Sequence, residues 1–106
     1  MINGDLNDFL DGIHWGQEIW LKYKGVGYFL QGWNKDGMYH LCRQVFNKGG
    51  VKIQVDWEVV DEDNDVCVKA FLDAPIWDGK KFFDVEREIK WVEEWDCIED
   101  EDANDD

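Results

Sequence analysis

The segment Asp61–Val66 has a spacing of carboxylates that could bind a metal ion. Asp61, Asp63 and Asp65 alternate in the manner of the first three ligands of an EF-hand calcium loop. The sixth position is Val66, where that loop needs glycine, and the twelfth is Leu72, where a bidentate glutamate belongs. The pattern therefore predicts a solvated loop that caps the next helix, and we expect neither a metal site nor a cofactor.

Few residues are candidates for nucleophilic chemistry. The chain contains no serine and no threonine, which excludes hydroxyl nucleophiles of those two types. His40 and Cys42 lie two positions apart in a predicted strand, so their side chains share a face but stand about 6.5–7 Å apart. That distance is too long for direct proton transfer, and we expect His14 to pack or to cap beside Trp15. The sequence indicates no catalytic residue and predicts a protein that is not an enzyme.

Charge is distributed unevenly along the chain. The formal net charge at pH 7 is -14. Residues 1–55 contain five acids and six bases, whereas residues 56–106 contain twenty acids and five bases. Such a one-sided negative field opposes direct binding to nucleic acid or to an anionic membrane, and it favours a basic protein partner.

Two groups of carboxylates are the predicted partner-binding residues. The first is expected to form a rigid cluster and the second to lie beside it, so that both pair with lysine or arginine side chains of the partner. They are Asp56, Glu58, Asp61, Glu62, Asp63 and Asp65, and then Glu93, Glu94 and Asp96.

In its shortness, acidity and aromatic content the chain resembles toxin-immunity proteins, restriction inhibitors and anti-CRISPR proteins, which is a likeness of composition. The resemblance implies a small inhibitor that imitates a nucleic-acid backbone. Such an inhibitor would occupy the basic groove of a nuclease or of another nucleic-acid-binding protein.

The seven tryptophans support an alternative interface. Alternation places Trp20 with Lys22 and Lys24, and Trp33 with Gln31, on the polar face of the predicted sheet. Exposed tryptophan is a typical anchor of protein interfaces. In this alternative the chain is an interaction module or accessory subunit that binds through an aromatic sheet face, and its acidic tail serves solubility only. The opposing possibility is that another element covers both tryptophans.

Hydrophobic periodicity predicts the elements of the first half. A short helix is expected within residues 3–12, capped by Asn3 or Asp5 and ended by Gly12. Glycine-containing turns separate period-2 runs over residues 17–60, which predicts a four-stranded antiparallel meander. One face of its last strand is apolar, with Trp57 in the core; this face comprises Val51, Ile53, Val55, Trp57 and Val59.

The second half must supply helices that cover the sheet. Residues 65–74 carry Val66, Ala70 and Phe71 at helical intervals, and Pro75 ends the run. We therefore expect a helix there that packs on the apolar face of the meander.

The remaining segments complete the predicted fold. A short helix is expected from about Gly79 to Arg87, followed by a last strand within residues 88–95, for which a helix is the alternative. The predicted fold class is α+β, an antiparallel meander of four to five strands packed against two or three short helices. Residues 1–95 are expected to form a single globular domain, and residues 96–106 an acidic, disordered tail.

The expected location of the protein and the redox state of its cysteines follow from the lack of a membrane span, of a signal peptide and of paired cysteines in the sequence. No apolar run approaches the roughly 18 residues that span a bilayer, and the acidic beginning of the chain lacks signal-peptide character. The three cysteines are an odd number without a C-x-x-C pair, which indicates isolated thiols rather than a disulfide framework. We expect a cytoplasmic protein and leave its oligomeric state open.

Overall fold

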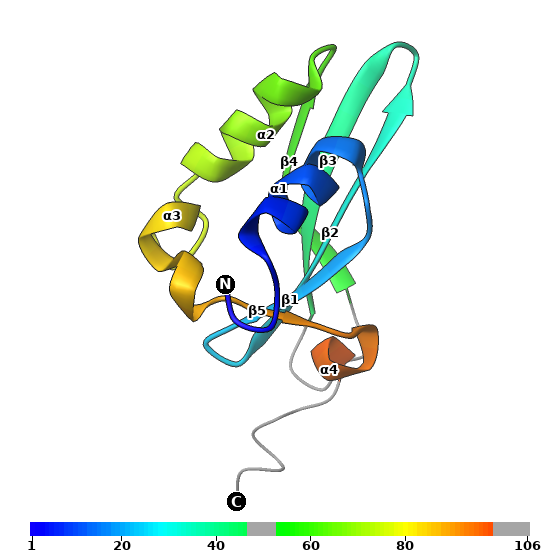
Figure 1. Ribbon diagram of the computed structural model, residues 1–106. Coiled ribbons are helices and arrows are strands. Elements are labelled where there is room, and N and C mark those ends of the chain that lie inside the picture. The colour runs from blue at the N-terminus through cyan, green and yellow to red at the C-terminus, as the bar shows by residue number, and fades with distance from the viewer. Residues whose placement is uncertain (47–52, 99–106) are drawn as a thin grey trace, which may run out of the picture.

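The computed structural model describes residues 1–46 and 53–98, which form a five-stranded antiparallel sheet with short helices packed against it (Figure 1). The strand order across the sheet is β4-β3-β2-β1-β5. The strands are β1 (Ile19–Tyr23), β2 (Val26–Lys35), β3 (Met38–Phe46), β4 (Ile53–Asp61) and β5 (Lys90–Val92). The helices are α1 (Leu6–Trp15), α2 (Asn64–Asp73), α3 (Phe82–Val85), the 3-10 turn η1 (Glu86–Glu88) and α4 (Glu94–Ile98). The predicted α+β class and the meander of four strands are confirmed.

The two described hairpins of the meander each turn within two residues. Lys24 and Gly25 have φ angles of 51° and 78°, and Asp36 and Gly37 have φ angles of 54° and 78°. Two successive positive φ angles are typical of type I′ turns, whose twist matches that of the flanking strands. Glycine at the second position of each turn adopts this backbone at little steric cost.

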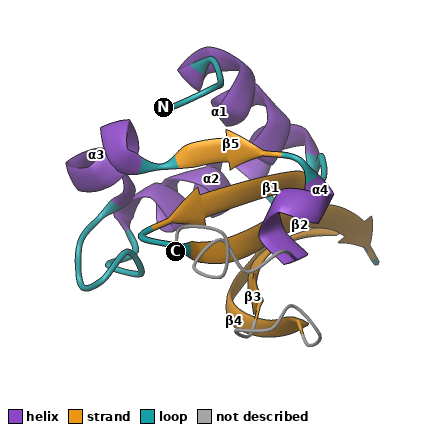
Figure 2. Cartoon of the chain, turned by 90° about the horizontal axis from the view of Figure 1, so that it is seen from below, coloured by secondary structure: helices purple, strands orange, loops and turns teal. Residues whose placement is uncertain are grey.

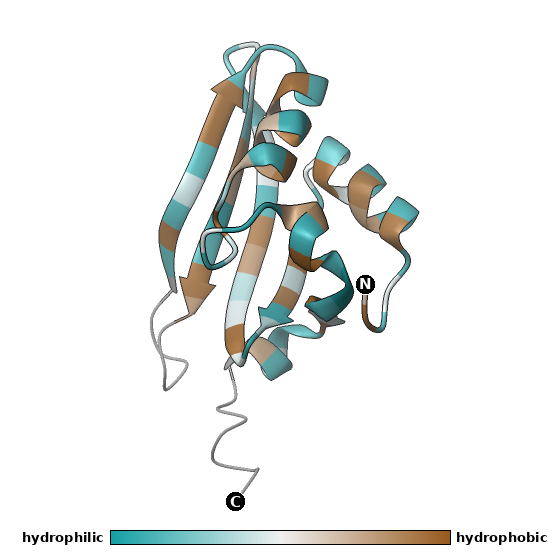
Figure 3. Ribbon diagram, turned by 90° about the vertical axis from the view of Figure 1, so that its left-hand side faces the viewer, coloured by the Kyte–Doolittle hydropathy of each residue, from teal (hydrophilic) through white to brown (hydrophobic). Residues whose placement is uncertain are grey.

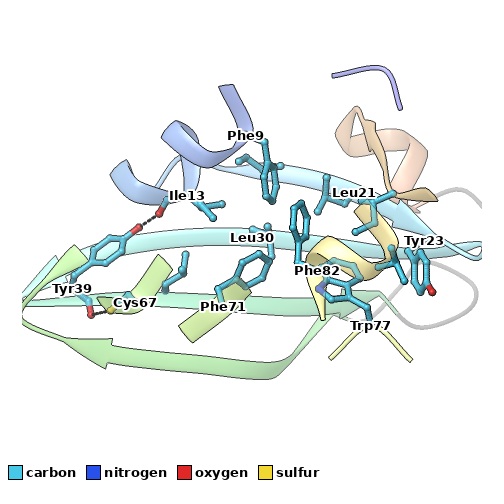
Figure 4. Packing of buried hydrophobic residues seen from close by; sticks show 14 residues of the cluster. Phe9, Ile13, Leu21, Tyr23, Leu30, Tyr39, Cys67, Phe71, Trp77 and Phe82 are labelled. Carbon is cyan, nitrogen blue, oxygen red and sulfur yellow. Dashed lines mark hydrogen bonds between the residues drawn. The ribbon is translucent and has the colours of Figure 1, made fainter. Parts of the chain in front are cut away.

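The sheet buries one side, here called the helix face, beneath α1, α2 and α3. Ile19 and Leu21 of β1 are fully buried in one hydrophobic cluster with Phe9, Phe71 and Phe82 from the three helices (Figure 4). The rings of Phe9 and Phe82 stack at 5.1 Å between centroids. This face is the core that the period-2 pattern of β1 predicts.

Hydrogen bonds fix the helices to the sheet at the end of the core near β3. The hydroxyl of Tyr39 donates to the carbonyl oxygen of Ile13 in α1 at 2.5 Å, and the thiol of Cys67 in α2 donates to the carbonyl oxygen of Tyr39 at 3.6 Å (Figure 4). Burial raises the pKa of Tyr39 to about 12, so its hydroxyl stays protonated, and remains a donor, well into the alkaline range. One residue of β3 therefore ties α1 and α2 together.

The opposite side of the sheet, here called the open face, is covered in part by α4 (Figure 2). The thiol of Cys97 donates to the carbonyl oxygen of Leu21 at 3.4 Å. A Cβ atom added at Gly27 would lie 2.8 Å from the carbonyl oxygen of Cys97, so this close approach requires glycine. Lys22, predicted on a polar face, does point to this side but is only 4% exposed.

A β-bulge interrupts the pairing of β3 with β4. Arg43 pairs with Trp57 and Gln44 pairs with Val55, so Asp56 is an extra residue in β4. The extra residue reverses the alternation of side chains along β4. Val55 therefore lies on the open face and is 51% exposed, so its predicted place on the apolar face with Trp57 and Val59 was wrong. Trp57 is half-buried and packs against the core. Val51 and Lys52 of the predicted strand lie outside the described residues.

The predicted boundaries of α1 are half right. Asp5 caps its N-terminus by accepting a backbone N–H of the first turn at 3.0 Å. Gly12 does not end the helix, which continues to Trp15 and is capped by Gly16 with φ of 79°. Gly12 is buried inside the helix, and a Cβ there would lie 3.0 Å from the Ile19 side chain. Packing against β1 stabilises the helix beyond the glycine.

The predicted helix before Pro75 is α2, in which Phe71 is buried as expected but Cys67 is buried in place of Val66. Cys67 and Phe71 are fully buried, whereas Val66 is 46% exposed. The cap of Asp63 on the N–H of Asp65 sets where the helix begins and therefore which residues face the sheet.

The last part of the chain differs most from the expectation. The predicted helix from Gly79 to Arg87 is shorter, because an antiparallel bridge between Trp77 and Lys80 holds Gly79 in a turn with φ of 81°. Residues 88–95 hold both predicted alternatives, since β5 is followed at once by α4.

The expected boundary between domain and tail also moves. Helix α4 runs across residues 95 and 96, and Cys97 is only 4% exposed. Asp96 therefore belongs to the folded part and not to the tail, while residues 99–106 lie outside the described part of the chain. Among the helices that the structure describes, none has the length and apolar character that crossing a bilayer requires.

Candidate functional site

The acids at the end of β4 and the start of α2 form a rigid group, here called the β4–α2 acidic surface. It comprises Asp61, Glu62, Asp63 and Asp65. The carboxylate of Asp61 accepts the backbone N–H of Asp63 at 2.9 Å, and the carboxylate of Asp63 accepts that of Asp65 at 2.9 Å. These local bonds fix the carboxylates of Asp61 and Asp63 in a turn and a helix cap, as the loop spacing predicts.

Contacts with α1 brace this surface from behind. The side-chain amide of Asn64 donates to the carbonyl oxygen of His14 at 2.7 Å, and His14 Nδ1 lies 3.1 Å from Asp65 Oδ1. The indole of Trp15 is 67% exposed, and its ring meets the imidazole of His14 edge-on at 4.5 Å. The acids therefore border the exposed ring of Trp15, which was not among the predicted partner-binding residues.

A shallow hollow of about 540 Å³ lies between α1 and the loop that follows β4. Its lining combines amide, carboxylate and aromatic groups, and the residues are His14, Trp15, Asn34, Glu62, Asp63 and Asn64. A lysine or arginine side chain suits such a lining, because the carboxylates neutralise its charge and the indole face attracts a cation. The sequence signal that could have placed Trp15 at the end of α1 is Gly16, the next residue, because a glycine commonly follows the last residue of a helix.

Asp56 does not join this group. Its carboxylate pairs with the guanidinium of Arg43, with Nη2–Oδ2 at 2.7 Å and Nε–Oδ1 at 3.0 Å. Arg43 is 5% exposed and lies over the rings of Tyr28 and Trp77 at 4.2 and 4.8 Å. Asp56 therefore compensates a buried charge, a role that the sequence could not reveal because the pairing depends on the bulge.

Glu58 lies on the open face of β4 opposite Cys42, and it is exposed. Among residues 1–46 and 53–98, no ion pair joins Glu58 or Glu62 to a lysine or arginine. Both carboxylates are therefore available to cations of a partner.

Glu93, Glu94 and Asp96 lie at the other edge of the sheet, after β5, and not beside β4 as expected. Glu93 and Asp96 line a groove of about 690 Å³, here called the β5 groove, between the N-terminal segment and β5. Its other lining residues are Asn3, Gly4, Asp5, Asp8, Glu18, Trp20, Lys90, Trp91 and Val92. The structure thus has acidic surfaces at opposite edges of the sheet. Asp5, Asp8 and Glu18 were not among the predicted partner-binding residues, because only tertiary pairing brings them to the β5 groove.

The two tryptophans of the alternative interface both lie on the open face. Trp20 is half-buried, with its ring 4.9 Å from that of Phe29, and Trp33 is 40% exposed. The rings of Trp33 and His40 stack at 5.3 Å with an interplanar angle of 8°. Of the pair, Trp33 offers the more accessible aromatic surface.

The thiols are poorly placed for chemistry. Cys42, Cys67 and Cys97 are buried and unlinked, and burial raises the pKa of each thiol, that of Cys97 to about 11. A thiol with so high a pKa carries little of the reactive thiolate at neutral pH. In the part of the chain that the structure describes, no three His, Cys, Asp or Glu side chains are grouped so that they could hold a metal ion.

In comparisons with known proteins, no protein-family model, no curated protein and no solved structure matches this chain.

Proposed function

We propose that this chain is a non-enzymatic inhibitor that binds a basic, nucleic-acid-handling protein through the β4–α2 acidic surface. The observation that carries the proposal is that three carboxylates are held in place around the exposed Glu62: those of Asp61 and Asp63 accept backbone N–H groups, and that of Asp65 contacts His14. A surface that is rigid before binding loses little conformational freedom when a partner docks.

The mechanism is competition for the same cations. The carboxylates of Glu62 and its neighbours pair with lysine and arginine side chains that otherwise contact phosphates, so nucleic acid is excluded from that surface. The net charge of -14 adds a long-range attraction that speeds encounter with a basic partner at low salt. The partner class includes nucleases, and inhibition takes place in the cytoplasm, where such a partner acts.

A second candidate function is favoured by the open face. Trp33 and Val60 are 40% and 42% exposed on this side of the sheet. In this candidate the protein is an interaction module or accessory subunit that docks through Trp33 and Trp20, and the acidic residues serve solubility.

The test is affinity capture on the full chain from a lysate of the source organism, at about 50 and about 200 mM salt, with and without added DNA or RNA. The proposal predicts a nucleic-acid-binding protein that is retained at the lower salt and released by nucleic acid. Purified chain must then inhibit nucleic-acid binding by that captured protein in a separate assay. A partner that withstands the higher salt and ignores nucleic acid contradicts the proposal and favours the open face.

A further inference from the structure

The two edges of the sheet differ in how their backbone groups are used. At the β5 edge the N-terminal segment pairs with the strand: Ile2 donates its N–H to the carbonyl of Ile89 at 2.9 Å, and Trp91 donates its N–H to the carbonyl of Ile2 at 2.9 Å. At the other edge β4 pairs with β3 alone among the described elements, and Figure 3 shows this strand at the margin of the sheet. Every second residue of such a strand directs its N–H and C=O groups outward without a strand partner.

The β-bulge limits how much of this edge can accept another strand. The ladder is disrupted at Asp56, so the longest uninterrupted stretch of β4 is the five residues Trp57–Asp61, here called the β4 edge. Within it Glu58 and Val60 point to the open face, and Trp57 and Val59 point to the helix face. Glu58 and Val60 are both exposed.

The side chains select which strand can pair there. Strand β4 has three acids and no lysine or arginine over Ile53–Asp61. A second copy that added its own β4 in the register centred on Glu58 would set carboxylate beside carboxylate, which is unfavourable in cross-strand pairs. A cationic side chain opposite Glu58 reverses the sign of that interaction, and an apolar side chain two positions away covers Val60.

We propose that the β4 edge accepts an extended cationic segment of a protein partner as a sixth strand of the sheet. The segment has lysine or arginine beside Glu58 and a β-branched or aromatic residue beside Val60. Backbone hydrogen bonds to Trp57–Asp61 provide the affinity, and the side chains that lie beside Glu58 and Val60 provide the specificity. This inference deepens the proposed function and rests on it for the charge of the partner; the β4–α2 acidic surface shares Asp61 with the β4 edge and continues from it along the chain.

The test uses the full chain and the synthetic peptide acetyl-Gln-Val-Gln-Arg-Gln-Val-Gln-amide, which has valine, arginine and valine on one face in either strand direction. NMR hydrogen exchange is recorded with and without the peptide. The expected result is slower exchange at outward-pointing amides of Trp57–Asp61, with other surface amides unchanged. A peptide with glutamate in place of arginine should bind at least tenfold more weakly.

A charge exchange makes the test specific. The variant Glu58→Lys should prefer the glutamate peptide over the arginine peptide, whereas the matched variant Glu94→Lys, at the far edge, should retain the original preference. No binding, binding without protection of the β4 edge, or a dimer whose β4 amides are already protected overturns the inference.

The outcomes also separate this inference from the proposed function. Peptide pairing at β4 together with capture of a partner that ignores nucleic acid leaves the sixth-strand docking standing and contradicts inhibition. If nucleic acid releases the captured partner but the peptide does not pair with β4, the proposed inhibition stands and the sixth-strand docking is contradicted.

Discussion

Arg43 and Asp56 are joined by two hydrogen bonds, at 2.7 and 3.0 Å, across the bulge between β3 and β4. The guanidinium also donates to the carbonyl oxygen of Ile76 at 2.7 Å. Its side chain is 6% exposed, so the charge of Arg43 is compensated by this one carboxylate and by the carbonyl rather than by water. The extra residue in β4 thus has a structural purpose, because it brings an acid to a buried base.

The variant Asp56→Ala should lower the free energy of unfolding by about 3 kcal/mol, since it leaves a buried guanidinium without its acid. Urea denaturation measures the loss. The control is Asp73→Ala, which removes an exposed pair with Lys69 at 3.7 Å and should cost about 0.5 kcal/mol or less. Equal losses in the two variants would contradict a structural role for Asp56.

The variant Phe71→Ala should lower the free energy of unfolding by about 4 kcal/mol, because the fully buried ring packs against Phe9, Trp57, Trp77 and Phe82. Val66→Ala on the same helix should cost about 1 kcal/mol or less, since its side chain is 46% exposed. Thermal or urea unfolding of both variants checks the orientation of α2. A larger loss for Val66 would show that the helix is rotated.

Stability should fall at alkaline pH because of Cys97. Burial raises the pKa of this thiol from 9.0 to about 11 in the folded protein. Below pH 9 both states keep the proton; above it the unfolded chain ionises first, so the stabilising contribution is lost as the pH rises to about 11. The total loss from this group is about 2 kcal/mol, at 1.36 kcal/mol per pKa unit less an allowance for partial solvation.

The measurement is the free energy of unfolding against pH for the natural chain and for Cys97→Ala. Tyr39 also has a raised pKa and remains in both proteins, so the difference between the two curves isolates the thiol. A difference that stays constant between pH 8 and pH 11 would contradict the shift.

The effect of a charge reversal on the rate of partner association should depend on where the reversed residue lies. Glu62→Lys on the β4–α2 acidic surface should slow association several-fold at low salt and flatten its salt dependence. Glu94→Lys changes the net charge by the same amount at the opposite edge and should have a smaller effect. Stopped-flow or surface-plasmon kinetics with the captured partner measure both; identical slowing would mean that only total charge matters.

Trp33→Ala tests the second candidate function. If the partner docks on the acidic surface, this variant should bind with unchanged affinity, because Trp33 lies on the open face, where its ring stacks on His40. A loss of more than tenfold in affinity would identify the open face as the interface, as expected when an aromatic anchor is removed. Calorimetric titration of the captured partner provides the measurement.

Local patterns predicted those parts of the fold that depend on neighbours in sequence. The alternation of Ile19, Leu21 and Tyr23, a helix cap at Asn3 or Asp5 and the glycine-containing turns were all visible without the structure. The cluster at Asp61–Asp65 was also predictable, because its carboxylates bond to backbone groups only two positions along the chain.

Features set by distant pairing were not predictable. The bulge is defined by how β4 pairs with β3, so the sequence of β4 alone does not indicate that Val55 faces solvent. Glu93 and Asp96 line one groove with Asp5 and Asp8 because β5 pairs with β1 and with the N-terminal segment. Gly12 lies within a helix that packing supports, although its intrinsic propensity opposes helix.

The order of the strands has a consequence for how the chain folds. Strands β1 to β4 pair with their neighbours in sequence, and such local contacts form early. Strand β5 must instead find β1 from the far end of the chain, with Lys90 opposite Lys22, and it pays a larger loop-closure entropy. During synthesis, the β4–α2 acidic surface therefore forms before β5 has paired with β1 and completed the β5 groove.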